Sequence, residues 1–363
     1  MKQSASRTGF AAVITRLIGA VLIGLLINPS TVSAQEPPAP SGISDVRVLN
    51  PGGELWRDVR QRTAPVSGKT QIKGVDTGVL INSNGDRWRH FRINQLIPIG
   101  GYVLGGVLLA LLLFYMIRGK VPVEGGLSDR KLLRYSNYER TIHWFIAGVF
   151  IFLGLSGLIL LFGRPVLIPL IGKEAFSVLA SAAKEGHNLM GPVFLLALIL
   201  IFVRFVRRNI YQKGDLTWLL RGGGVIGKKH VPSNFFNMGE KTLFWMLVFV
   251  GGTIIVSGFV LVSPSLGHTR EWMELAHVGH AIGALLMIAV IFGHIYIGTV
   301  GMEGAIEGMK TGYCDLNWAK EHHDFWANEA EKNGEALTNE EVACLRGDFE
   351  RLPREISVKE AGK

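Results

Sequence analysis

Two histidines, His280 and His294, lie in one apolar run that continues to Val300. On an α-helix, their separation of fourteen residues places the imidazoles about 21 Å apart along the axis and on nearly the same face. Ionisable side chains are costly inside a membrane, and by default they mark a functional site that faces the interior of a helical bundle. Imidazole is also a common metal ligand, so the chemistry of this run depends on which other histidines lie at the same depths.

The composition is typical of a membrane protein. The 363 residues are 48% hydrophobic and 18% charged, and they include 45 glycines, which favour close packing of membrane helices. A net charge of +9 would also suit a nucleic-acid binder, but the basic residues flank the apolar runs, as in the loops of membrane proteins. We therefore expect membrane lipid around this chain and no nucleic acid.

The chain has only two cysteines, Cys314 and Cys344, and it contains no C-x-x-C-H motif. This excludes a four-cysteine iron–sulfur cluster and covalently attached haem within the chain. Both cysteines follow the last apolar run, and we expect them to be free thiols in a reducing compartment.

The N-terminal part has the features of exported sequence. Residues 1–34 combine basic residues, an apolar run and a small-residue end, which predicts a secretory signal peptide cleaved before Gln35. The alternative is an uncleaved anchor helix. Residues 35–97 then form an exported, periplasmic segment, in which the alternation around Asn84 and Gly85 predicts a short β-hairpin.

Five apolar runs are long enough to cross about 30 Å of hydrocarbon. They cover residues 98–117, 143–163, 187–206, 242–262 and 278–300. The loops before the second and fourth runs hold six and eight Lys or Arg, whereas the other two loops hold three and one. By the positive-inside rule the basic loops are cytoplasmic, which agrees with an exported N-terminus. The tail 302–363 is then cytoplasmic, and we expect it to be a helical or partly disordered appendage.

This topology sorts four histidines into two pairs at matched depth. His187 and His280 lie near the outer face of the membrane, and His143 and His294 lie near the inner face. His277 is the alternative to His280, but it lies about 100° away from His294 around the helix. We expect His277 at the outer rim, facing water or lipid headgroups.

Two histidines on facing helices suit a b-type haem, because they fill both axial positions of the iron and leave none open for a substrate. Two such haems would carry electrons from one side of the membrane to the other. Gly154 and Gly157 share a helix face with His143, and Gly191 lies one turn after His187, where small residues would let a flat macrocycle approach the backbone. Close helix packing is the alternative explanation for the glycines, and hydrogen-bonding histidines of a transporter are the alternative for the whole set.

Between Asn137 and about His323, the chain contains YERTIHWFIAG, then HNLMGPVFLLALILIFVRFVRRNI with DLTWLL, FFNMGEKTLFW, and HAIGALLMIAVIFGHIYIG with GAIEGM and WAKEHH. In this order and spacing, these stretches resemble the cytochrome b (gamma) subunit of membrane-bound, quinone-reducing formate dehydrogenases. The signal peptide, the exported segment and the first span are absent from the short members of that family, whereas longer variants look like this chain.

The resemblance implies an all-α membrane protein. Its core is a four-helix transmembrane bundle over 137–301 that binds two b haems, and 98–117 is an additional transmembrane helix. The family's ligand positions match His143, His187, His280 and His294, with the same pairing that the depths indicate.

The resemblance also implies a quinone site on the cytoplasmic side, near Asn237. The Asn237 amide could hydrogen-bond a quinone carbonyl directly or through water, and the alternative is that it caps the helix that follows. The family often has glutamine where this chain has Glu240, which leaves the polarity of the quinone pocket open. No catalytic residue for formate oxidation is expected in this chain.

The expected function is that of a membrane anchor and electron-transfer subunit in the bacterial inner membrane. Electrons would come from formate through a molybdenum or tungsten catalytic (alpha) subunit and an iron–sulfur (beta) subunit, and they would leave on a quinone. One alternative is the cytochrome b subunit of a hydrogenase or a sulfur-compound reductase. The alternatives of another class are a transporter and a ferric reductase that sends electrons outward.

Overall fold

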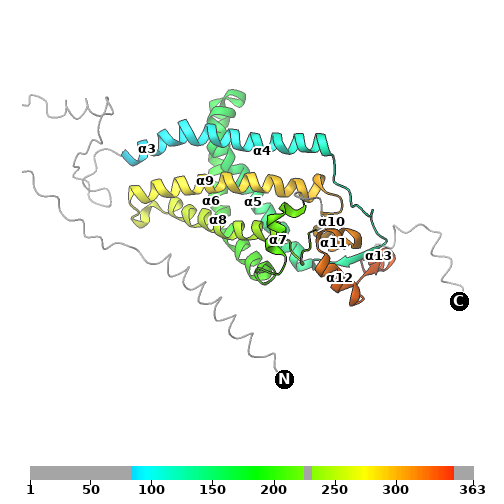
Figure 1. The fold of residues 1–363 in the computed structure, drawn as a ribbon. Helices are drawn as coiled ribbons and strands as arrows, with labels where there is room; N and C mark the ends of the chain where they lie inside the picture. The colour runs from blue at the N-terminus through cyan, green and yellow to red at the C-terminus, as the bar shows by residue number, and fades with distance from the viewer. Residues whose placement is uncertain (1–82, 225–230, 347–363) are drawn as a thin grey trace, which may run out of the picture. The chain divides into compact units, whose positions relative to one another are not determined.

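The computed structural model describes residues 83–224 and 231–346 of the chain (Figure 1). All of them belong to one unit, Pro65–Lys363, and the second unit, Met1–Ala64, lies outside them. The predicted signal peptide 1–34 and the exported segment as far as residue 82 therefore lie outside the described residues, as does the end of the tail.

Five long helices make up the membrane part of the described structure. They are α4 (Ile97–Arg118), α5 (Asn137–Val166), α6 (Ile168–Phe205), α8 (Met238–Val262) and α9 (Arg270–Tyr296). Each lies in a helical stretch that is long and apolar enough to cross a bilayer, and each of these stretches includes one of the predicted spans.

Polar residues at three helix starts explain where the helices begin. Ser136 accepts a hydrogen bond from the Glu139 N–H, and the Glu139 carboxylate accepts one from the Ser136 N–H, which caps α5. Asn237 and Glu240 form the same reciprocal pair at the start of α8, and Thr269 caps α9. These caps satisfy N–H groups that a helix cannot pair within itself.

Helices α5, α6, α8 and α9 pack against one another in sequence. α5 contacts α6, α6 contacts α8, and α8 contacts α9. The apolar core between them includes Ile146 and Val149 of α5, Phe194 and Ala197 of α6, and Ile255 of α8. This core occupies the parts of α5 and α6 that follow His143 and His187 along the chain.

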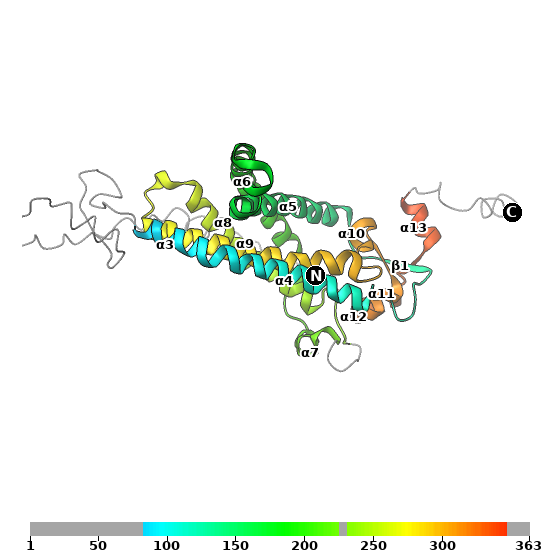
Figure 2. The ribbon, with the colours of Figure 1, turned by 90° about the horizontal axis from the view of Figure 1, so that it is seen from above.

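α4 runs beside α9 in both views of the ribbon (Figures 1 and 2). Leu104 of α4 packs with Leu285 and Ile288 of α9 in a small buried cluster. Beyond the end of α4, Val121 forms a backbone bridge with Met302, just after the last turn that follows α9. The additional helix is therefore attached to the one helix that carries both His280 and His294.

The prediction of a hairpin around Asn84 and Gly85 is wrong, because these residues lie in helix α3 (Ser83–Phe91). A π-helical turn, Arg92–Leu96, joins α3 to α4, so the helical segment starts well before the predicted span. The alternation of apolar and polar residues indicated a strand, but continuation from a membrane helix and contacts with α9 favour the helix.

Polar and aromatic contacts hold α3 against the first turns of α9. Glu274 accepts hydrogen bonds from Asn84 Nδ2 at 3.0 Å and from Arg87 Nη2 at 2.8 Å. The Trp88 indole stacks on the His277 imidazole, with ring centroids 4.9 Å apart and an interplanar angle of 11°. Trp88 of α3 therefore covers one face of the His277 ring, a contact that the prediction of an outer-rim position did not include, and His277 stays part-buried.

Outside the membrane helices, a small antiparallel sheet departs from the all-α prediction. Its strands are β1 (Arg130–Leu133), β2 (Tyr313–Asp315) and β3 (Leu337–Thr338), in the order β2-β1-β3. Lys131 of β1 pairs with Asp315 on one side and with Leu337 on the other. Such short strands carry almost no periodic signal in the sequence, and their partners lie far along the chain.

The described part of the tail folds against the segment between α4 and α5, and it is more than an appendage. Its helices are α10 (Glu307–Thr311), α11 (Leu316–His322), α12 (Asp324–Lys332) and α13 (Asn339–Arg346). Leu132, Cys314 and Trp318 are at most 5% exposed in its core. Burial raises the pKa of the Cys314 thiol to about 11, and Cys314 and Cys344 are both free, as predicted.

Candidate haem-binding histidine pairs

Four histidines on three helices form two close pairs. His187 of α6 and His280 of α9 have ring centroids 6.0 Å apart, and His143 of α5 and His294 of α9 have centroids 6.2 Å apart. The structure therefore brings together the same partners that matched depth in the membrane indicated. The role of these residues as haem ligands stays a prediction.

The separation within each pair fits one iron between the two rings. A bond from a metal to imidazole nitrogen is about 2 Å long. The atoms of a five-membered ring with bonds of about 1.33 Å lie roughly 1.1 Å from its centre. Two imidazoles on opposite sides of one iron thus have centroids about 6 Å apart, and both observed distances meet this requirement.

Both rings of the His187–His280 pair are held through Nδ1. The His187 Nδ1 lies 2.8 Å from Ser156 Oγ. The His280 Nδ1 lies 2.9 Å from the Ile254 carbonyl oxygen and 3.2 Å from Ser257 Oγ. A ligand histidine typically donates its second ring N–H to such an acceptor, which leaves the Nε2 lone pair for the metal.

The His143–His294 pair has a different environment. The His143 Nδ1 is buried and has no hydrogen-bond partner among the described residues. The edge of the His143 ring meets the Trp144 indole, with centroids 5.2 Å apart. Packing, and not a second hydrogen bond, orients this ring in the described structure.

Two glycines make room for the imidazoles of the His187–His280 pair. A Cβ atom on Gly157 would lie 3.4 Å from His187 Cε1, and one on Gly258 would lie 3.3 Å from His280 Cε1. Gly157 thus makes room for the His187 ring itself, whereas its spacing in the sequence predicted a position beside a macrocycle. A Cβ on Gly191 would meet nothing within 4 Å, which leaves open space beside that helix.

The serines next to these glycines were not among the predicted site residues. Ser156 precedes Gly157 in the second span, and Ser257 precedes Gly258 in the fourth, so the same dipeptide occurs once in each of these two apolar runs. A serine in each of two apolar runs is the signal that could have indicated them.

The described residues hold no group of three or more His, Cys, Asp or Glu that could bind a bare metal ion. Metal binding by the histidine pairs would therefore need further ligands from a bound group. A porphyrin supplies four equatorial nitrogens and leaves two axial positions, which two imidazoles fill.

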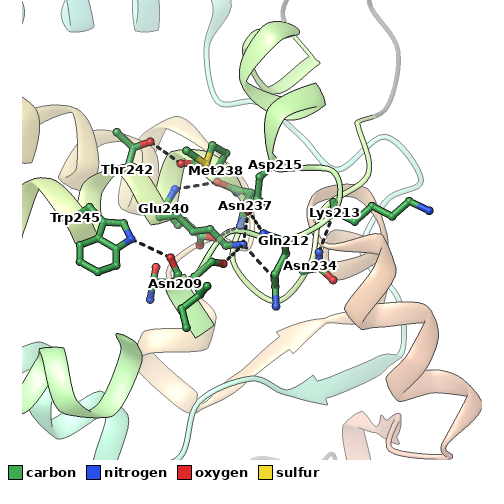
Figure 3. Close-up of polar contacts among 12 residues, drawn as sticks. Asn209, Gln212, Lys213, Asp215, Asn234, Asn237, Met238, Glu240, Thr242 and Trp245 are labelled. Carbon is green, nitrogen blue, oxygen red and sulfur yellow. Dashed lines mark hydrogen bonds and ion pairs between the residues drawn. The ribbon is translucent and has the colours of Figure 1, made fainter. Parts of the chain in front are cut away.

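Asn237 caps α8 in the structure (Figure 3). Its Oδ1 accepts a hydrogen bond from the Glu240 N–H at 3.0 Å, and its own N–H donates to Glu240 Oε2 at 2.9 Å. Its Nδ2 has no hydrogen bond to any of the described residues, so one donor group remains for a ligand. The Glu240 carboxylate also accepts a hydrogen bond from Arg134 at 2.9 Å.

A buried ion pair joins α7 (Asp215–Leu220) to the start of α8, next to Asn237. Lys241 Nζ lies 2.7 Å from Asp215 Oδ2, and the side chains of both residues are at most 2% exposed. The same ammonium donates to Gln212 Oε1 and to the Ile210 carbonyl, each at 3.1 Å. All three N–H groups of this lysine therefore have acceptors, which offsets the cost of burying its charge.

Comparison with known proteins agrees with this architecture. Residues 134–312 match the family model described as prokaryotic cytochrome b561. A cytochrome b556(Fdn) subunit of the nitrate-inducible formate dehydrogenase of Escherichia coli is 29% identical over 210 residues, which cover 56% of this chain and 94% of that protein. The predicted resemblance to formate dehydrogenase cytochrome b subunits is confirmed.

Two further relatives have the same kind of name. A cytochrome b556(fdo) subunit of an Escherichia coli formate dehydrogenase is 28% identical over 208 residues, which cover 56% of this chain and 95% of that one. A formate dehydrogenase cytochrome b556 subunit of Haemophilus influenzae is 26% identical over 225 residues, covering 59% and 90%. The five apolar helices and the family match together support a multi-pass membrane protein.

The family match covers α5, α6, α8 and α9, and it therefore includes both histidine pairs and Asn237. It begins at Arg134 and ends at Gly312, so α3, α4 and most of the tail lie outside it. Helices α3 and α4, which pack along α9, and the three strands of the small sheet lie outside the matched region.

Proposed function

We propose that this chain is the membrane anchor and electron-transfer subunit of a formate dehydrogenase. The observation that carries the proposal is the geometry of the two pairs, His187 with His280 and His143 with His294, each at the separation that one axially ligated iron requires. The names of the relatives support formate as the source of the electrons.

A b-type haem in each pair would supply one-electron transfer. The chain itself would supply the two imidazoles that hold each haem, which would leave no position on the iron open to a substrate. Ile146, Val149 and Phe194 surround the helix segments beyond the histidines with apolar side chains, so water is kept out of this part of the bundle. Exclusion of water also strengthens the electrostatic effect of each ligand.

For the electron acceptor, we propose a quinone near Asn237. Arg134, just before α5, pairs with Glu240 of α8 at 2.9 Å, so α5 and α8 begin at the same end of the helices. His143 lies in the second turn of α5, which puts Asn237 at the same end as the His143–His294 pair. Its Nδ2 group could donate to a quinone carbonyl, because its Oδ1 is engaged by the cap.

The proposed orientation follows from the basic loops. Residues before α5 and α8 would face the cytoplasm, and the segment before α3 would be exported into the periplasm. The His187–His280 pair then faces an iron–sulfur (beta) subunit and a molybdenum or tungsten (alpha) subunit that oxidises formate. Protons for the quinol would enter from the cytoplasm, so turnover would charge the inner membrane.

The first test is haem content. A pyridine haemochrome assay and a reduced-minus-oxidised spectrum of the purified chain should give two b-type haems per polypeptide. A chain that binds no haem would favour the alternative of a transporter with structural histidines.

The second test identifies the donor. In native membranes with the full complex, formate should reduce both haems, and a quinone analogue should block their reoxidation. Reduction by hydrogen or a sulfur compound, with none by formate, would favour the alternative subunit classes.

A further inference from the structure

Two Ser-Gly dipeptides meet the same atoms of two different histidines. Ser156 Oγ lies 2.8 Å from His187 Nδ1, and Ser257 Oγ lies 3.2 Å from His280 Nδ1. The glycine after each serine leaves room for the Cε1 edge of the same ring. Each ring of the His187–His280 pair thus lies against one serine hydroxyl and one glycine. These residues belong to α5 for His187 and to α8 for His280.

The direction of these hydrogen bonds follows from the number of protons available. Ser156 donates to the Phe152 carbonyl at 2.8 Å, and Ser257 donates to the Thr253 carbonyl at 2.7 Å. A serine hydroxyl has one proton, so toward the imidazole each Oγ acts as an acceptor. The imidazole must then carry its proton on Nδ1, which leaves the Nε2 lone pair free.

A second contact gives the same tautomer for His280. The Ile254 carbonyl oxygen lies 2.9 Å from His280 Nδ1, and a carbonyl can only accept. His280 thus has two acceptors at Nδ1, and the backbone of Leu153 interacts with the His187 ring in the same way. The structure gives the buried Nδ1 of His143 no acceptor among the described residues, so the second pair lacks this arrangement.

We propose that Ser156 and Ser257 are positioning residues for the His187–His280 haem site, an inference that rests on the proposed function. Hydrogen bonding from Nδ1 fixes the ring and makes the imidazole a stronger donor to the metal. A stronger donor would stabilise ferric iron over ferrous iron, so the two serines would give a haem held by His187 and His280 the lower reduction potential of the two. Electron transfer toward a haem held by His143 and His294, the pair at the Asn237 end, would then be downhill.

The test is a potentiometric titration of both haems in the purified full-length chain, followed by their α-bands and by low-spin ferric EPR signals. His280→Ala and His143→Ala assign each signal to a pair. Ser156→Ala should shift the potential of the His187–His280 haem upward and leave the other unchanged. Ser257→Ala should shift the same potential in the same direction.

Two further variants separate positioning from packing. Ser156→Thr keeps a hydroxyl that can accept, and it should restore the wild-type potential. Thr253→Ala is the matched control, because Thr253 also donates to its own helix, at the Phe249 carbonyl, and contacts neither pair; its potentials should equal those of the wild type. If Ser156→Ala loses the haem, retention at the wild-type potential in Ser156→Thr supports the proposal, and loss in both contradicts it.

The outcomes distinguish this inference from the proposed function. A wild-type chain without haem would overturn both. Two haems with unchanged potentials in Ser156→Ala and Ser257→Ala, or a wild-type potential that is higher at His187–His280 than at His143–His294, would overturn the assignment of the serines alone.

Discussion

An imidazole can bind iron on a membrane helix only if its ring is oriented, and the two pairs achieve this differently. His187 and His280 are oriented by acceptors at Nδ1, whereas His143 is oriented by packing next to Trp144. The residues that matter at this scale are therefore the four histidines together with the small side chains on the neighbouring helices.

Replacing a single histidine should remove a single haem. We expect His280→Ala to lose the haem at His187–His280 and to keep the other, because the ligands of the second pair are untouched. The measurement is haem per polypeptide in the pyridine haemochrome assay. His277→Ala is the matched control, since it lies one turn away and stacks on Trp88; haem loss in this variant would mean that the ligand has been misassigned.

A methyl group at Gly258 should disturb the same site by crowding. The added Cβ would lie 3.3 Å from His280 Cε1, so the ring must shift, and overpacking of this kind typically costs about 1–3 kcal/mol. We expect Gly258→Ala to lower haem occupancy at His187–His280. Gly252→Ala on the same helix meets nothing within 4 Å and should keep full occupancy; equal loss in both would point to helix packing.

At the scale of elements, the described structure adds α3, the loop before α8 and a small sheet to the membrane helices. The loop depends on Lys241 and Asp215, a buried pair inside a cluster of acceptors. α3 depends on Trp88 and Glu274, which attach it to α9.

Breaking the buried pair should be costly. Asp215→Leu leaves the Lys241 ammonium buried without its counter-charge, and such a loss typically costs about 3–5 kcal/mol. We expect a clear drop in thermal stability of the purified protein. The double variant Asp215→Leu with Lys241→Met should recover much of the loss, because no unpaired charge remains; a double variant as unstable as the single one would contradict this account.

Removing the aromatic contact should loosen α3. Trp88→Ala deletes the stack on His277, and aromatic pairs contribute about 0.5–1.5 kcal/mol beyond the area that they bury. We expect faster amide hydrogen exchange over Ser83–Phe91 and unchanged exchange in α8. Arg89→Ala is the control, because Arg89 pairs only with Asp86 of its own helix at an exposed site.

The membrane helices and the partners within each histidine pair could be predicted from the sequence, because both follow from strong patterns. Apolar runs of about twenty residues define spans, and a fourteen-residue spacing within one run fixes the relative depth of His280 and His294. Helix α3 and the small sheet could not be predicted in this way. Contacts with α9 override the local alternation around Asn84, and β1 pairs with residues that follow the last span.

The individual contacts of the site could not be predicted from sequence patterns either. The sequence allowed two roles for Asn237, a helix cap and a quinone contact, and the structure shows that it caps α8. Ser156 and Ser257 each precede a glycine in an apolar run, but the sequence does not show that they lie opposite His187 and His280.

For the whole molecule, the folded tail and the membrane helices meet at buried charged and titratable groups. His323 is 1% exposed, and its Nδ1 lies 2.9 Å from the Asn234 carbonyl. Burial, together with the nearby charge of Arg134, holds the pKa of His323 well below its ordinary value of 6.5. The charged or titratable groups around it are Arg134, His322 and Glu240, the last at 3.9 Å.

Acid should therefore weaken the attachment of the tail. Below pH 6.5 the unfolded chain takes up a proton at His323 that the folded chain does not, so the free energy of unfolding falls as the pH decreases toward the folded-state pKa. We expect limited proteolysis of the tail to speed up between pH 7 and about pH 5. His323→Asn keeps a polar group at this site and should flatten that dependence; an unchanged pH dependence would assign it to another group.

The attachment of α4 at both ends has a mechanical consequence. The stack of Trp88 on His277 lies at one end of α9, and the bridge between Val121 and Met302 lies just beyond the other. Helices α3 and α4 therefore brace the helix on which His280 and His294 lie fourteen residues apart. The spacing between the two histidine pairs is set by this one braced helix.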